Sequence, residues 1–266
     1  MGLNHCPWRG KDSRLLRKKG FTIHPLSLGT VTDFDKSLCT LRQNHGVKMD
    51  IPCLAWVVTD GAATVLVDTG PCDPARSARY HRPLTKRPDE ETARALARIG
   101  IDPAKIERVI LTHLHWDHSF NLESLPNAAF FVQQRELAYA ADPLVADRAA
   151  YEAGIPGITP PWRSVLDRIV ALEGEQEICP GVAVLPLPGH TPGSQGVVVE
   201  TAAGPWIIAG DAVPLYENWN DGLKRIPSGI YQDLFAYEAT LTRLIPFGRR
   251  LLPSHDPLVL ERAVYP

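Results

Sequence analysis

The chain contains 266 residues, of which 44% are hydrophobic and 22% charged, and its formal net charge at pH 7 is −2. This composition is typical of a globular protein and argues against a disordered or coiled-coil chain. Because Lys and Arg are not in excess, nucleic acid is not expected as a partner. No run of about 18 apolar residues occurs, so neither a membrane-spanning helix nor a membrane partner is expected.

The first 20 residues are predicted to be a flexible basic tail, and residues 21–266 a single domain. The tail contains six basic side chains but no apolar segment of the kind found in secretory signal peptides, so no signal peptide is expected. The five cysteines form no CxxC motif and are odd in number, which argues against a disulfide framework. A reducing, cytoplasmic location is therefore predicted.

In the first half of the chain, two β-rich runs at residues 51–59 and 63–68 are joined by Asp60-Gly61, a strong hairpin signal. Residues 89–100 have acids in the first turn and Gly at the end, which predicts a helix. Further strands are expected at residues 21–28, 107–112 and 128–132, a helix at residues 134–141, and loops at residues 29–50, 71–88 and 142–168. The last of these loops is long enough to be functional.

The second half continues with strands and one helix. Strands are expected at residues 182–187, 196–200, 206–209 and 250–252, and a helix at residues 232–245. Strands dominate both halves and helices are interspersed, which favours an α/β fold of sheets covered by helices over a pure β-sandwich.

The segment HLHWDH at residues 113–118 places four potential metal ligands directly after a buried strand. His113 and His115 are two residues apart, so on an extended chain they point the same way. Asp117 and His118 follow where the chain would turn. Neutral imidazoles and a carboxylate held close together on a rigid scaffold form a divalent-metal site, and the sequence predicts one here.

Three later residues occur in the same context, each just past a predicted strand. His190 lies in the turn PGHTPG, Asp211 follows Gly210, and His255 lies in the segment SHD. Strand ends that converge on one site are how α/β scaffolds build active centres. The remaining histidines, His5, His24, His45 and His81, lack such a context and are expected at the surface.

Together these motifs, with the DTG turn at Asp68, resemble those of the metallo-β-lactamase superfamily over residues 51–256. The resemblance implies an αββα sandwich, in which two mixed β-sheets are flanked by helices, with a site for two Zn²⁺ or other divalent ions at one edge. It implies His113, His115 and His190 as ligands of one metal, Asp117, His118 and His255 as ligands of the other, and Asp211 as the carboxylate that bridges them. Asp68 either orients a ligand or is a turn-forming residue.

Within the superfamily, the chain is most similar to the N-acyl homoserine lactonase-like group. The HLHWDH form of the motif, the PGHTPG turn and the short segment after His255 are the features that it shares with this group. The similarity implies a quorum-quenching hydrolase that opens an acyl homoserine lactone or a related lactone by metal-hydroxide attack. Another hydrolase of the same fold, acting on a thioester, ester or phosphodiester, is the alternative. Either way a small molecule is the expected substrate, and a homodimer is left open.

One position departs from that group. Many such lactonases carry a tyrosine three residues after the bridging aspartate, where this chain has Pro214. We expect Tyr216, or else Tyr231 or a water molecule, to replace the missing hydroxyl at the developing oxyanion, and Asp117 or a second metal-bound water to protonate the leaving alkoxide. Trp116 lies inside the metal motif and is expected to line the substrate pocket. The other candidates for the pocket walls, Trp162, Tyr216 and Trp219, either line it as well or belong to ordinary packing.

Overall fold

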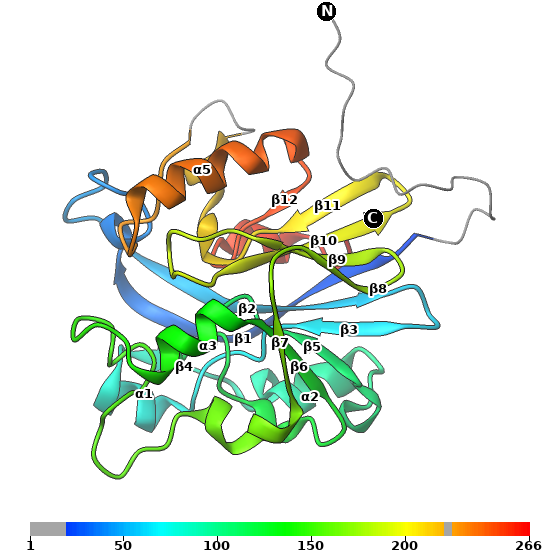
Figure 1. Ribbon diagram of the computed structural model, residues 1–266, viewed down its shortest axis with the longest axis horizontal. Helices are drawn as coiled ribbons and strands as arrows, with labels where there is room; N and C mark the ends of the chain where they lie inside the picture. The colour runs from blue at the N-terminus through cyan, green and yellow to red at the C-terminus, as the bar shows by residue number, and fades with distance from the viewer. Residues whose placement is uncertain (1–19, 221–224) are drawn as a thin grey trace, which may run out of the picture.

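The computed structural model describes residues 20–220 and 225–266, whose strands form two sheets packed face to face (Figure 1). The larger sheet has the order β4-β1-β2-β3-β5-β6-β7 and the smaller one the order β12-β11-β10-β9-β8. The larger sheet consists of β1 (Thr22–Asp35), β2 (Lys48–Thr59), β3 (Thr64–Val67), β4 (Leu84–Thr85), β5 (Arg108–Ile110), β6 (Ala129–Gln133) and β7 (Ile169–Leu172). The smaller consists of β8 (Gln176–Cys179), β9 (Val182–Pro186), β10 (Gln195–Thr201), β11 (Gly204–Ile208) and β12 (Leu251–Leu252).

Both sheets are mixed and carry helices on their outer faces. The pairs β3-β5, β5-β6, β6-β7 and β11-β12 are parallel, and the other named pairs are antiparallel. In Figure 1, α1 and α2 lie on the outer side of the larger sheet and α5 on that of the smaller. The helices are α1 (Pro74–Tyr80), α2 (Thr92–Arg98), α3 (Gln134–Ala141), α4 (Tyr216–Trp219) and α5 (Leu234–Leu244). The predicted αββα sandwich is confirmed.

The apolar runs of the central strands are explained by burial on both faces. Along β2, Trp56 faces the core between the two sheets, whereas its neighbour Val57 faces the core under the helices. Along β10, Val197 lies between the sheets and Val198 packs towards α5. Successive side chains of a strand point to opposite faces, so a strand covered on both sides has to be apolar throughout.

The predicted hairpin at Asp60-Gly61 is confirmed. It joins β2 and β3 as antiparallel neighbours, and the Asp60 carboxylate accepts hydrogen bonds from the backbone N–H groups of Ala62 and Ala63 at 2.9 and 2.8 Å. Short polar side chains that satisfy their own turn in this way favour tight connections. The basic tail predicted for residues 1–20 lies outside the described residues except for Gly20.

All three predicted loops contain regular structure. The strand expected to end at residue 28 continues as β1 to Asp35, because Gly29 (φ 144°) lies where the pairing with β2 shifts register and the strand then resumes. The segment 71–88 contains α1, for which Asp73 is the N-cap residue and Pro74 the first helical residue. Strands β7 and β8 were not predicted, and residues 161–168 of the third loop form a 3₁₀ helix.

None of the helices in residues 20–220 and 225–266 is long and apolar enough to cross a membrane.

Candidate metal centre

The seven predicted ligands meet at one edge of the sandwich, where strands of both sheets end. The loop with residues 113–118 follows β5 of the larger sheet, and His190 follows β9 of the smaller sheet. Asp211 follows β11, and His255 follows β12, which pairs with β11 in parallel. Parallel neighbours end at the same edge of a sheet, which brings Asp211 and His255 together. Ligands far apart in the sequence thereby come to lie around one point.

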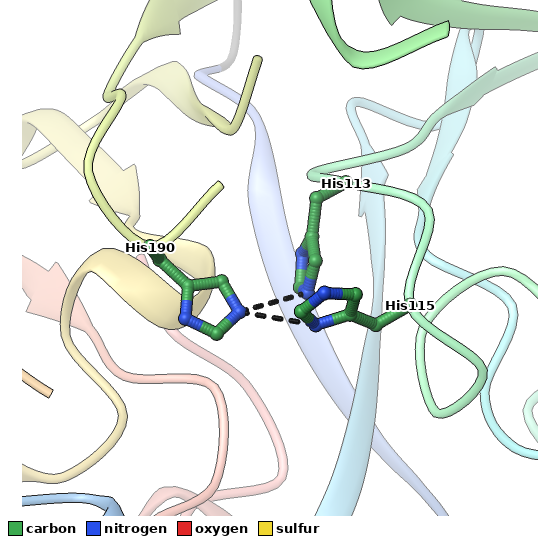
Figure 2. Close-up of side chains that lie close together, drawn as sticks. All are labelled: His113, His115 and His190. Carbon is green, nitrogen blue, oxygen red and sulfur yellow. Dashed lines mark hydrogen bonds between the residues drawn. The ribbon is translucent and has the colours of Figure 1, made fainter. Parts of the chain in front are cut away.

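His113, His115 and His190 form a first group of three buried imidazoles (Figure 2). The Nε2 atom of His190 lies 3.3 Å from Nε2 of His113 and 3.2 Å from Nδ1 of His115. A metal ion held tetrahedrally by nitrogens at 2.0–2.1 Å requires its ligand atoms to be separated by about 3.3 Å. The spacing within this group therefore suits a tetrahedral cation such as Zn²⁺.

Asp117, His118 and His255 form a second group beside the first. The Nε2 atoms of His118 and His255 are 3.3 Å apart, and the Oδ2 atom of Asp117 lies 3.9 and 3.8 Å from them. Both imidazoles are buried, and Asp117 is only partly exposed. This second group offers two nitrogen donors and one oxygen donor from two segments of chain.

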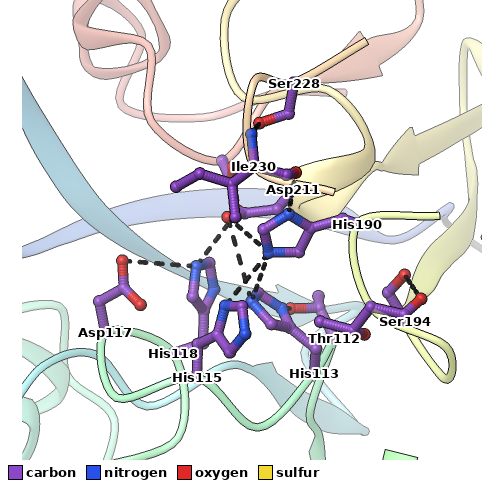
Figure 3. Close-up of polar contacts among 12 residues, drawn as sticks. Thr112, His113, His115, Asp117, His118, His190, Ser194, Asp211, Ser228 and Ile230 are labelled. Carbon is purple, nitrogen blue, oxygen red and sulfur yellow. Dashed lines mark hydrogen bonds and ion pairs between the residues drawn. The ribbon is translucent and has the colours of Figure 1, made fainter. Parts of the chain in front are cut away.

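The Asp211 carboxylate lies between the two groups (Figure 3). Its Oδ1 atom is 3.2 Å from Nε2 of His118 and 3.1 Å from Nε2 of His255, while its Oδ2 atom is 3.3 Å from Nε2 of His190. Although burial favours the neutral acid, the imidazoles of His255, His118 and His190 hold the pKa of Asp211 well below its usual range. The ionised carboxylate is thus placed to serve both groups at once.

The hydrogen bonds behind the imidazoles show that the donor set fits metal ions. The Nδ1 atoms of His190 and His255 each lie 2.9 Å from a backbone carbonyl, that of Ile230 and of Pro52 respectively. A carbonyl oxygen can only accept, so these Nδ1 atoms carry hydrogens, and in the neutral form of each ring the Nε2 atom presents its lone pair towards the centre. Neutral imidazoles whose lone pairs converge at about 3.3 Å are favoured when a cation lies between them. The geometry therefore suits a cation.

Two of the imidazoles are kept in the neutral form that binds metal. Burial and the neighbouring imidazoles lower the pKa values of His113 and His115 well below the usual value. Metal ligands have to be deprotonated, so this shift removes competition from protons over the whole neutral pH range.

Asp68 lies where a ligand-orienting role requires it. Its carboxylate, which is fully buried, accepts hydrogen bonds from the backbone N–H and the hydroxyl of Thr112 at 2.7 and 2.8 Å and from Nδ1 of His118 at 2.9 Å. The bond to Nδ1 fixes the tautomer of His118 and aims its Nε2 at the centre. Asp68 also has a positive φ of 60°, so its backbone turns sharply at the strand end.

A cavity of ≈ 450 Å³ opens directly onto His115, Asp117, His190, Asp211 and His255. Its walls are mainly apolar and come from β1, β2, the segment after α3 and the loops around residues 116, 214 and 230. The side chains that form these walls are Val31, Phe34, Leu38, Ile51, Trp116, Ala149, Ala150, Pro214 and Ile230. Small-molecule sites typically combine such apolar walls with a few polar groups.

Of the aromatic residues expected in this pocket, Trp116 lines it and the others do not. Trp162 and Trp219 are buried in separate hydrophobic clusters. The sequence interpretation also missed His81, which was expected at the surface. Its side chain is 2% exposed, lines the cavity and stacks on Trp116 with ring centroids 4.4 Å apart.

The structure does not bring Tyr216 to the metal centre, which corrects its expected placement. Its ring packs against the core between the sheets, and its hydroxyl donates a hydrogen bond to that of Tyr265. Tyr231, the other candidate, packs beside α5 and is not among the residues that line the cavity. Neither tyrosine therefore lines the cavity above the predicted ligands, whereas Pro214 does.

Comparison with known proteins identifies the family and the fold of the chain. The family model described as the metallo-beta-lactamase superfamily matches residues 50–252. An N-acyl homoserine lactonase of a Bacillus species is 29% identical over 199 residues, which cover 70% of this chain and 74% of that protein. N-acyl homoserine lactonase AttM of Azorhizobium caulinodans is 26% identical over 234 residues, which cover 82% of this chain and 86% of that protein.

Solved structures share the fold. An N-acyl homoserine lactone hydrolase, with the product N-hexanoyl-L-homoserine bound at its catalytic metal centre, superposes with a TM-score of 0.73 at 21% identity. The match covers 91% of this chain and 96% of that one. AidC, a dizinc quorum-quenching lactonase, superposes with a TM-score of 0.67 at 15% identity and covers 94% of this chain and 91% of its own. At these identities the likeness concerns the fold.

Proposed function

This chain belongs to the metallo-β-lactamase superfamily and is a metal-dependent hydrolase, and we propose that it holds two zinc ions and opens the ring of a lactone with an apolar acyl chain. The observation that carries the proposal is the apolar cavity of ≈ 450 Å³ directly above the seven predicted ligands. Relatives named N-acyl homoserine lactonases support the choice of substrate class. An acyl homoserine lactone or a related lactone is the expected substrate.

The ligand assignment is part of the proposal. His113, His115 and His190 would hold one ion, Asp117, His118 and His255 the other, and Asp211 would bridge them. When bound, the ions polarise the carbonyl of the substrate and lower the pKa of water, so that a nucleophile is available near neutral pH. These residues would fix both ions at the floor of the cavity.

Side chains of the cavity are proposed to transfer the proton and to bind the acyl chain. Water adds to the lactone carbonyl carbon, the ring C–O bond breaks, and the leaving alkoxide takes up a proton to give a hydroxy acid. Asp117 is proposed to carry that proton, because its carboxylate is partly exposed and lines the cavity. The apolar walls, with Ile230 and Phe34 among them, would hold the acyl chain and limit the entry of water.

A substrate panel tests the reaction. Opening of a lactone gives a single product, because the alkoxide stays attached to the acid, and it releases one proton at neutral pH. Proton release followed at constant pH should therefore match the loss of lactone measured by chromatography. Thioesters and phosphodiesters, the alternative substrates, are assayed in parallel. If the fully metal-loaded protein hydrolyses a thioester or a phosphodiester but no lactone, the proposed substrate class is wrong.

Elemental analysis tests the metal content separately. Two zinc ions per chain are expected after purification without chelators. A folded protein that, after zinc supplementation, retains fewer than two ions would contradict the dinuclear assignment, whatever its activity.

A further inference from the structure

One buried carboxylate outside the ligand set joins the two loops that carry the first group of histidines. Glu136 lies in the first turn of α3, is fully buried and accepts four hydrogen bonds. Its Oε1 atom accepts from the backbone N–H of Leu114 at 3.0 Å and from the hydroxyl of Tyr151 at 2.7 Å. Its Oε2 atom accepts from the hydroxyl of Thr191 at 2.6 Å and from the backbone N–H of Gly193 at 3.2 Å.

Two of these donors are neighbours of the predicted ligands in the chain. Leu114 lies between His113 and His115, and Thr191 directly follows His190. The two loops come from different sheets, since one follows β5 and the other follows β9. Glu136 therefore bridges the two segments whose imidazole nitrogens approach to 3.2–3.3 Å.

The packing around Glu136 leaves little freedom for the loop that carries His190. A Cβ atom on Gly193 would lie 2.1 Å from the backbone nitrogen of Glu136, so only glycine permits this close approach. Tyr151 completes the arrangement, because its hydroxyl binds Glu136 while its ring lies edge-on to His115 at 4.7 Å between centroids. Helix, loop and ligand are thus packed as one unit.

The carboxylate form of Glu136 matches this arrangement. Both of its oxygens accept, and the backbone N–H groups of Leu114 and Gly193 can only donate. Its position in the first turn of α3 places the negative charge at the positive end of that helix. An amide in its place would turn an N–H group towards one of these fixed donors.

From this geometry we infer that Glu136 is a positioning residue that sets the distance of His190 from His113 and His115, and thereby the metal affinity of that group. Its four hydrogen bonds go to none of the ligand imidazoles, and it is not among the residues that line the cavity. The inference rests on the metal sites of the proposed function but not on the identity of the substrate, so it is tested by metal binding rather than by turnover.

The test is the substitution Glu136→Gln, followed by competition for Zn²⁺ with a chelator of known affinity. Loss of a partner behind the ligands typically costs about 10–100-fold in metal affinity. We expect a loss of that size for the ion held by the three histidines. That ion is identified as the one that the variant His190→Ala also loses. The ion held by the second group should be released at the same chelator concentration as in the unsubstituted protein.

Glu90→Gln is the matched control. Glu90 is 2% exposed and likewise accepts hydrogen bonds from a backbone N–H, that of Arg87 at 2.7 Å, and from a hydroxyl, that of Ser27 at 2.8 Å. Glu90→Gln should lower the melting temperature without changing the affinity for either ion. Equal loss of zinc in both variants would reduce the role of Glu136 to general stability and overturn the inference.

A milder pair covers the case in which Glu136→Gln does not fold. Thr191→Val removes one of the four hydrogen bonds with little change of shape, and Thr191→Ser restores the hydroxyl. Weaker zinc binding at the three-histidine group in Thr191→Val, with recovery in Thr191→Ser, supports the inference. Unchanged affinity in both variants, or in a folded Glu136→Gln, overturns it.

The test also separates this inference from the proposed function. If the unsubstituted protein binds a single ion, the dinuclear proposal fails, while the affinity ratio between the variants still decides the role of Glu136.

Discussion

The floor and the walls of the cavity are held in contrasting ways. On the floor, hydrogen bonds to His118, His190 and His255 fix the direction of each imidazole, and the acceptors come from segments remote in the sequence. On the walls, side chains such as Phe34 and Ile230 are placed by packing alone. Directional bonds define a ligand position closely, whereas apolar packing tolerates exchange of one hydrocarbon shape for another. The floor therefore sets the chemistry, and the walls set which substrate reaches it.

The largest effect should come from the residue shared by both halves of the floor. Asp211→Asn removes the negative charge that faces both groups of imidazoles. We expect loss of at least one metal ion and a fall in kcat beyond the about 10–100-fold that partners behind the ligands typically cost. Elemental analysis and steady-state kinetics measure the two effects.

Asp256→Asn is the control for that substitution. Asp256 neighbours His255 but accepts from the backbone N–H groups of Tyr216 and Leu258 instead of facing the metal ligands. It should retain both ions. If Asp211→Asn kept two ions and normal turnover, the bridging assignment would have to be abandoned.

A smaller effect is expected from Asp68→Asn, which leaves every ligand in place. Asn tolerates the positive φ of this position, so the backbone need not change. An amide has only one acceptor oxygen, so the bond to either Thr112 or His118 is weakened. We expect zinc affinity at the second group to fall about 10–100-fold, measured by chelator competition. A change confined to the first group would show that Asp68 does not act through His118.

The contrast between floor and walls also explains what the sequence could predict. Each predicted ligand follows an apolar run, and strand ends at one sheet edge converge, so the set could be assembled without coordinates. Phe34 could not be predicted because it falls in residues 29–50, a segment expected to be a loop, whereas the first strand continues into it past a bulge. Glu136 carried no signal either, since an acid in the first turn of a helix is commonplace and its donors lie in two remote loops.

The walls should affect substrate choice and leave the chemistry alone. Ile230→Ala removes a side chain from the cavity but keeps the backbone carbonyl that binds His190. We expect KM for the preferred acyl chain to rise by about 10–200-fold, the range of 1–3 kcal/mol for lost apolar contact, with kcat and zinc content unchanged. Ile245→Ala, at a position 48% exposed, is the control. A fall in kcat without a change in KM would instead mean that Ile230 acts on the chemical step, as the residues of the floor do.

The smallest effect is expected from Tyr216→Phe, which lies outside both regions. Its hydroxyl donates to Tyr265, whose own hydroxyl donates to the Val259 carbonyl at 2.9 Å, so this pair is satisfied within the core. Loss of such a bond costs about 0.5–1.5 kcal/mol of folding free energy, whereas loss of an oxyanion donor lowers kcat by about 10²–10³-fold. Denaturant unfolding and lactone kinetics distinguish the two, and we expect a small loss of stability with kcat and metal content unchanged. Tyr265→Phe should behave in the same way, because it breaks the same pair. A large drop in kcat for Tyr216→Phe alone, at full metal content, would mean that this hydroxyl turns to the substrate during catalysis and that Pro214 has been compensated after all.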